Sequence, residues 1–90
     1  MFQLVFTETY LKGEKKFLKN HTDLIERYKK VLRLLELNPN HPSLRLHKLK
    51  GKFNNKYSVS VTMNYRIILT FAIVKSEIVL IDIGSHDDIY

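Results

Sequence analysis

The sequence predicts an α+β domain: an N-terminal strand, a two-helix hairpin, and then a three- to four-stranded antiparallel sheet. Apolar and polar residues alternate at the start of the chain, follow helical spacing up to residue 37, and alternate again from residue 44 onward. Strands that follow two helices and are joined by short turns indicate a meander-like sheet with the helices packed on one face. Ninety residues suffice for one such domain, so we expect residues 1–90 to form a single unit.

The first strand is predicted at residues 2–6, where apolar Phe2, Leu4 and Phe6 occupy every second position. Thr7 then has the side chain of a helix N-cap, and the apolar positions of the following helix lie on one side. Gly13 is expected to weaken that helix by roughly 1 kcal/mol relative to alanine.

A second helix is predicted from Leu24, with Thr22 or Asp23 as its N-cap. Its apolar residues recur at the spacing i, i+3, i+4, i+7, and prolines at positions 39 and 42 end it. The two helices are expected to form an antiparallel hairpin. We interpret their lysine-rich outer faces as solvated rather than as a nucleic-acid surface.

Two shorter strands are predicted beyond the prolines. Residues 44–49 have alternating leucines and lead into a turn at Gly51. In residues 57–63, apolar side chains from Tyr57 to Met63 alternate with small hydroxyl side chains, which is typical of a half-buried strand.

The last two strands are predicted to be more deeply buried. Asn64 can supply a tight turn, after which residues 66–73 are almost continuously apolar. Residues 78–83 repeat that pattern after a turn at residues 75–77, and residues 84–90 are expected to form a loop or a short helical turn.

The charge of the chain is strongly segregated. The formal net charge is +6, and no Asp or Glu lies between Glu36 and Glu77, although that segment contains seven Lys or Arg residues. Such a positive field favours a polyanion or an acidic protein as partner. The sequence has no Cys and no apolar run of the ~18 residues that a membrane span requires, so we expect a protein of the reducing cytoplasm that does not enter a membrane.

Several familiar catalytic motifs are missing from the sequence. It has no glycine-rich phosphate loop, no HExxH and no Gly-x-Ser-x-Gly, and the spacing of its four His residues matches no zinc pattern. We therefore expect no cofactor and no metal. What remains for chemistry is a set of histidines and cations around the segment Leu46–Lys52 and near the end of the chain.

These residues have the properties that metal-independent cleavage of RNA requires. A base must remove the proton of the ribose 2′-hydroxyl, a cation must stabilise the phosphorane, and an acid must protonate the leaving 5′-oxygen. Histidine suits both proton transfers, and arginine suits the cationic role. His47, Arg66 and His86 lie at or near strand ends that can be neighbours in one sheet, while Tyr90 can stack on a base or close the core.

Three sequence pieces together resemble the RelE/ParE superfamily of toxins, especially its YafQ-like and RelE/StbE branches. They are Leu46–Lys52, the stretch Tyr65-Arg66-Ile67-Ile68, and Gly84–Tyr90. The resemblance implies the toxin of a type II toxin–antitoxin system, which cleaves mRNA on the ribosome and is neutralised by a cognate antitoxin protein.

The resemblance also implies roles for single residues. His47 matches the first active-site histidine of the YafQ-like pattern, and His86 matches its near-terminal histidine. Arg66 matches the catalytic arginine of the RelE-like pattern, and Tyr90 matches a terminal aromatic residue. RNA binding is expected from four basic residues of the central segment: Arg45, Lys50, Lys52 and Lys56.

This chain also departs from the YafQ-like pattern, because Val61 and Tyr65 stand where that pattern has a further histidine and an aspartate. The division of acid and base between His47 and His86 therefore stays open. Two other functions also stay open at this point: a ParE-like DNA gyrase inhibitor without nuclease activity, and an inactive basic binding module.

Overall fold

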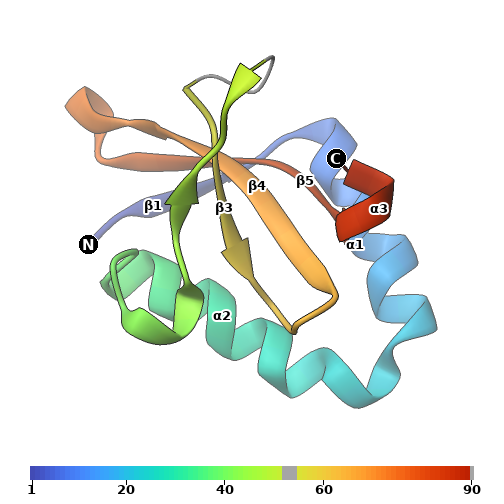
Figure 1. The fold of residues 1–90 in the computed structure, drawn as a ribbon. Coiled ribbons are helices and arrows are strands. Elements are labelled where there is room, and N and C mark those ends of the chain that lie inside the picture. Colours follow the sequence, from blue (N-terminus) through green and yellow to red (C-terminus); the bar gives the residue numbers. More distant parts are fainter. Residues whose placement is uncertain (52–54, 90) are drawn as a thin grey trace.

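A computed structural model describes residues 1–51 and 55–89 of the chain. Within these residues, five strands form one mixed sheet in the order β1-β5-β4-β3-β2 (Figure 1). The last four strands pair antiparallel, whereas β1 joins the edge of β5 in parallel. The strands are β1 (Gln3–Phe6), β2 (His47–Lys48), β3 (Tyr57–Ser60), β4 (Tyr65–Ala72) and β5 (Glu77–Ser85).

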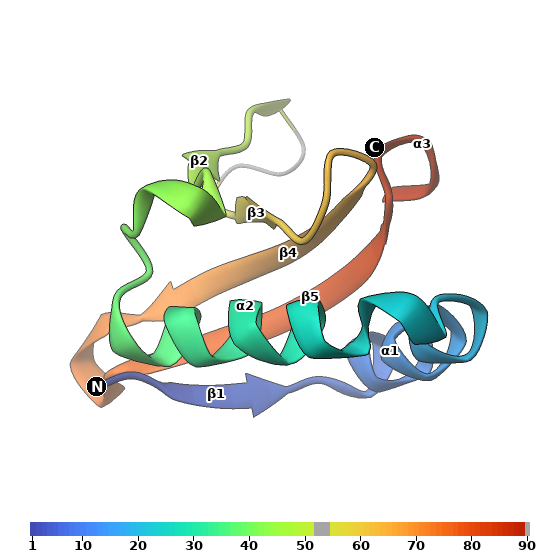
Figure 2. The ribbon, with the colours of Figure 1, turned by 90° about the horizontal axis from the view of Figure 1, so that it is seen from below.

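Two long helices cover one face of the sheet, and a short third helix follows β5 (Figure 2). Their buried side chains, among them Tyr10 and Leu35, pack against Val59, Leu69 and Leu80 of the strands in one hydrophobic core. The helices are α1 (Glu8–Asn20), α2 (Ile25–Leu37) and α3 (His86–Ile89), and short 3-10 turns occur at η1 (Thr22–Leu24), η2 (Pro42–Leu44) and η4 (Ile73–Lys75). None of the described helices has the length and apolar character needed to cross a bilayer.

A buried polar network joins the two long helices. The Tyr10 and Tyr28 hydroxyls are 2.5 Å apart, and Tyr28 donates a hydrogen bond of 2.6 Å to the Glu14 carboxylate. Burial raises the pKa of Tyr10 and of Tyr28 well above the usual tyrosine value, and the neighbouring Glu14 carboxylate adds to the rise in both. Both hydroxyls therefore stay protonated, which lets them donate within this network.

Gly13 marks the closest approach of α1 to β5. A Cβ at this position would lie 3.0 Å from Ile83 Cγ2 and 3.1 Å from the Ile83 carbonyl oxygen. The pairing of β4 with β5 shifts register between Ile68 and Leu69, close to where Asp82 and Ile83 lie against the helix. The glycine that weakens the helix locally thus allows α1 to pack closely on β5.

The predicted fold class is confirmed, including the strand, the two-helix hairpin and the antiparallel strands that follow. The N-cap prediction at Thr7 is also confirmed, because its hydroxyl accepts a hydrogen bond of 3.2 Å from the Tyr10 amide. The cap predicted for the second helix is wrong. Thr22 and Asp23 lie in the turn η1, and α2 begins after Leu24 without a side-chain cap.

Two details of the strand predictions are also wrong. Leu44 is fully buried at the end of the turn η2, and Arg45 adopts a left-handed conformation with φ 51°, so the strand begins only at His47. Proline at the first position of η2 favours the helical turn. Met63 is 89% exposed, because β3 ends at Ser60 and the chain has already entered the turn to β4.

Candidate active site

The hydroxyl of Ser58 connects two of the residues that the sequence singles out. Ser58 Oγ lies 3.5 Å from His47 Nδ1 and 3.4 Å from His47 Nε2, and it accepts a hydrogen bond of 3.4 Å from Arg66 Nη1. Ser58 itself is fully buried, whereas His47 is exposed and Arg66 is half-buried. The three residues form a cluster whose serine is shielded and whose base and cation face outward.

Strand register explains why these side chains meet. Ser58 of β3 pairs directly with His47 of β2, and Ser60 pairs with Arg66 of β4. Residues directly opposite each other share one face of a sheet, as do residues two apart in a strand. All three side chains therefore lie on the face opposite the core, since Val59 between the two serines points into the core.

The chemistry of the three side chains limits which of them can donate and which can accept a hydrogen bond. A guanidinium can only donate, so Arg66 occupies a lone pair of the Ser58 oxygen. The second lone pair of that oxygen can accept a hydrogen bond from the protonated ring nitrogen of neutral His47. Because the hydroxyl is almost equidistant from both ring nitrogens, either one can be this donor, and the other is then the unprotonated nitrogen that can accept a proton.

His86 lies on the other side of Arg66 from His47. Gly84 pairs with Arg66 across β4 and β5, and His86 follows two residues later at the start of α3, where its amide donates a hydrogen bond of 3.0 Å to the Asn64 carbonyl. The His86 ring is mostly exposed and lies 3.9 Å from the Asp87 carboxylate. Sheet spacing puts the Cα atoms of His47 and Gly84 about 16 Å apart, so the histidines flank the arginine without meeting.

The basic residues predicted to bind RNA lie along the β2–β3 side of the sheet. Arg45 and Lys50 are exposed on either side of β2, and Lys56 is half-buried, with its carbonyl oxygen accepting a hydrogen bond of 2.9 Å from the Leu49 amide. Lys52 and Tyr90 lie outside the described residues. For the described part of the chain, no three His, Asp or Glu side chains come together as metal ligands would.

Ser58 is the residue that sequence reasoning missed. In the sequence, Ser58 belongs to a run of small hydroxyl side chains at alternate positions of residues 57–63, and this pattern predicted an exposed polar face. The structure shows that Ser58 is instead buried beneath His47 and Arg66. A serine on the outer face of a central strand can be buried only when larger side chains from both neighbouring strands cover it.

Solved structures of toxins and of a toxin complex share this fold. A metal-bound toxin from Helicobacter pylori has 22% identity and a TM-score of 0.84, with 100% of each chain covered. YafQ from E. coli has 16% identity and a TM-score of 0.84, covering 100% of this chain and 99% of that one. In the YoeB–YefM complex from Staphylococcus aureus, one chain has 17% identity and a TM-score of 0.75, covering 96% of this chain and 98% of that one.

No protein-family model and no curated protein sequence matches the chain. At the identities found, similarity to solved structures establishes the fold alone. The fold is the RelE-like toxin fold that the sequence resemblance implied.

Proposed function

We propose that this chain with the RelE-like fold is the toxin of a type II toxin–antitoxin system and a metal-independent endoribonuclease that cleaves mRNA on the ribosome in the cytoplasm. The observation that carries the proposal is the Ser58 bridge between His47 and Arg66 on the open face of the sheet. An imidazole, a fixed cation and a shared hydroxyl are the groups that phosphodiester transfer needs. A gyrase inhibitor or a simple binding module would need no such arrangement.

In the proposed reaction, the outward nitrogen of His47 removes the proton of a ribose 2′-hydroxyl. The 2′-oxygen then forms a bond to the adjacent phosphorus, and the remaining N–H groups of Arg66 stabilise the charge on the non-bridging oxygens. The bond from phosphorus to the 5′-oxygen breaks, and that oxygen takes up a proton. The products are a 2′,3′-cyclic phosphate and a free 5′-hydroxyl.

His86 is proposed as the acid that protonates the leaving oxygen. Its position on the other side of Arg66 from His47 suits an in-line displacement, in which attacking and leaving oxygens lie on opposite sides of phosphorus. Tyr90 is proposed to stack on a base of the RNA. Lys50, Lys52, Lys56 and Arg45 are proposed to bind the RNA backbone electrostatically.

The proposed partner is a cognate antitoxin. The chain of the YoeB–YefM structure shares this fold and is in a complex with another protein. The charge of this chain favours an acidic antitoxin segment that covers the basic face. Coexpression with the product of the adjacent gene should yield a complex that copurifies at low salt, and failure to copurify would contradict this part of the proposal.

The test of the proposal compares two activities. The wild-type protein should cleave translated mRNA, mapped by primer extension, and His47→Ala and Arg66→Ala should each lower the rate about 10²-fold or more. Supercoiling by DNA gyrase in the presence of the same protein should be unaffected. Gyrase inhibition without mRNA cleavage would establish the ParE-like alternative, and the absence of both effects would leave a binding module.

A further inference from the structure

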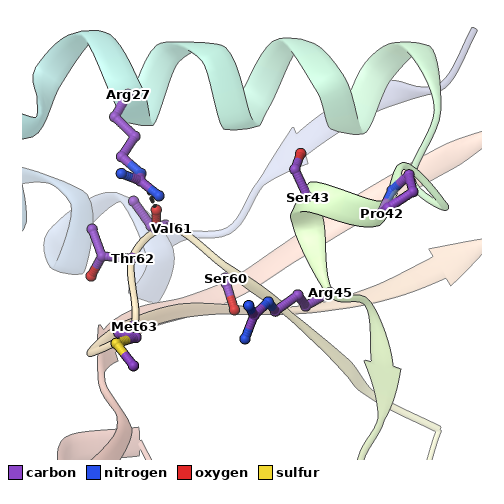
Figure 3. A pocket seen from close by; sticks show the side chains of 8 residues that line it. All are labelled: Arg27, Pro42, Ser43, Arg45, Ser60, Val61, Thr62 and Met63. Carbon is purple, nitrogen blue, oxygen red and sulfur yellow. Dashed lines mark hydrogen bonds between the residues drawn. The ribbon is translucent and has the colours of Figure 1, made fainter.

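A groove at the edge of β3 combines two arginines with several hydroxyl groups (Figure 3). It has a volume of about 430 Å³ and lies between α2, the turn η2 and the β3–β4 turn. Both charged residues that line it are arginines, and none of its lining residues is acidic. Its polar side chains are those of Arg27, Ser43, Arg45, Ser60 and Thr62.

The two arginines are held in place by the backbone. Arg27 Nε donates a hydrogen bond of 2.8 Å to the Val61 carbonyl oxygen, which fixes the guanidinium at the groove and leaves its terminal nitrogens for other acceptors (Figure 3). Arg45 has φ 51°, and its amide donates a hydrogen bond of 3.2 Å to the Pro42 carbonyl. In Figure 3 the Arg45 side chain extends toward Ser60.

The groove repeats the chemistry of the Ser58 cluster one step further along β3. Ser58 is paired with the guanidinium of Arg66, and Ser60 lies beside that of Arg45. The two serines lie on the same face, about 6.6 Å apart along the strand. This spacing is similar to that between successive phosphates of an extended single-stranded nucleic acid.

The edge of β3 is also open where the groove begins. β2 pairs only with Tyr57 and Ser58, so it does not cover Ser60. Val61 donates to Tyr65 across the β4 side, and the alternation of an antiparallel ladder therefore turns the Ser60 amide toward the groove. Two guanidiniums and the Ser60 hydroxyl thus line one groove, and the Ser60 amide faces it from the strand edge.

We propose that this groove is a second phosphate-binding site, which holds the RNA phosphate adjacent to the one that is cleaved. This inference rests on the proposed function, because it places the scissile phosphate at Arg66 and the neighbouring phosphate between Arg27 and Arg45. Arginine binds phosphate oxygens bidentately, and the hydroxyl of Ser60 adds a further donor. The groove thus fixes the register of the RNA strand, while the Ser58 cluster carries the chemistry.

The test measures binding of a short 2′-O-methyl RNA, which cannot be cleaved, by fluorescence anisotropy at several KCl concentrations. Each contact to a single-stranded phosphate contributes about −0.7 to the slope of log K against log salt. Because the groove holds one phosphate, Arg27→Gln combined with Arg45→Asn should make the slope shallower by about 0.7. Between 50 and 200 mM KCl, the affinity of this double variant should fall about 2.6-fold less than that of the wild type.

Two further variants keep this test decisive. Arg45→Asn alone leaves the Arg27–Val61 hydrogen bond intact, and asparagine tolerates the left-handed backbone, so this variant should fold. Its salt slope should change by about half as much as that of the double variant. Arg33→Gln removes the same charge from the exposed side of α2, away from the groove, and serves as the matched control. Circular dichroism establishes that each variant is folded.

The outcomes separate the two proposals. If the wild type binds RNA and the groove variants show the same salt slope as Arg33→Gln, the second phosphate site is refuted. The proposed function is then unaffected. No RNA binding by the wild type refutes the second phosphate site, whereas the proposed function is decided by the primer-extension assay on translated mRNA. Groove variants that bind RNA normally but lose an acidic antitoxin peptide would assign the groove to the protein partner, which also overturns the inference.

Discussion

Substituting Ser58 by alanine tests whether its hydroxyl positions His47 and Arg66, the groups proposed to be catalytic. The three contacts of Ser58 Oγ, at 3.4 to 3.5 Å, lie beyond the range of strong hydrogen bonds. A bond to a charged partner contributes about 1.5 to 3 kcal/mol, and such lengths favour the lower end or less. A loss of about 1 to 2 kcal/mol corresponds to a rate about 5- to 30-fold lower, which is less than the loss expected on removing Arg66 itself.

The assay is the single-turnover rate of mRNA cleavage in a reconstituted translation system, read by primer extension. The expected loss lies in the rate of the chemical step rather than in binding, because the buried Ser58 lies beneath the groups that are proposed to contact RNA. Thr70→Val is the matched control, because it removes a hydroxyl from the same face of the sheet. Among the described residues, that hydroxyl donates a hydrogen bond only to the Asn55 carbonyl. It should cleave at the wild-type rate.

A double-mutant cycle distinguishes positioning from a general loss of structure. If Ser58 acts through His47, then Ser58→Ala should cost much less in a His47→Ala background than in the wild type. The melting temperature should fall by no more than about 8 °C in either background, because one net hydrogen bond is worth about 1 kcal/mol. Fully additive rate losses, or a wild-type rate for Ser58→Ala, would refute the reasoning.

Three predictions concern stability. Tyr28→Phe breaks the bonds to Tyr10 and Glu14 and should lower the unfolding free energy by about 1 to 3 kcal/mol in a denaturant titration, whereas Tyr57→Phe, on a half-buried ring, should change it by less than about 0.5 kcal/mol. Because the folded pKa of Tyr10 and of Tyr28 is raised, the unfolded state loses their protons first, so stability is full below about pH 10 and falls above it. The fall should be about 2.7 kcal/mol per pH unit from these two groups, and Tyr28→Phe should remove about half of it; an unchanged slope would contradict the network. Gly13→Ala should destabilise despite the better helix propensity of alanine, since its Cβ would meet the Ile83 carbonyl at 3.1 Å; a higher melting temperature would show that the helix can shift.

Periodicity predicted most of the fold, because long segments with one buried face leave little choice. The helices and the β3 to β5 strands follow directly from the spacing of their apolar residues. The segment from Leu44 to Lys48 was mispredicted because alternating leucines also fit a proline-initiated turn followed by a short strand. The parallel pairing of β1 with β5 was not foreseen, since no local pattern specifies a partner more than 70 residues away.

The candidate site was only partly accessible from sequence. Residue types singled out His47 and Arg66, yet their connection depends on the register that sets Ser58 opposite His47 and places Arg66 two positions further along the same face. A shift of one residue would turn Ser58 into the core and Val59 outward. Arg27 was not singled out in the sequence, and only the three-dimensional structure places it at the groove.

The parallel pairing of β1 with β5 also governs when the molecule can fold during synthesis. Residues 3–6 are made more than 70 residues before their partners at residues 77–80. Ile78 and Leu80 of that late strand are fully buried in the core that α1 and α2 cover. A growing chain therefore lacks β5, the strand between β1 and β4, until residues 77–85 have been made, and contacts over so long a separation form late. The five-stranded sheet can be completed only after β5 has left the ribosome that made it.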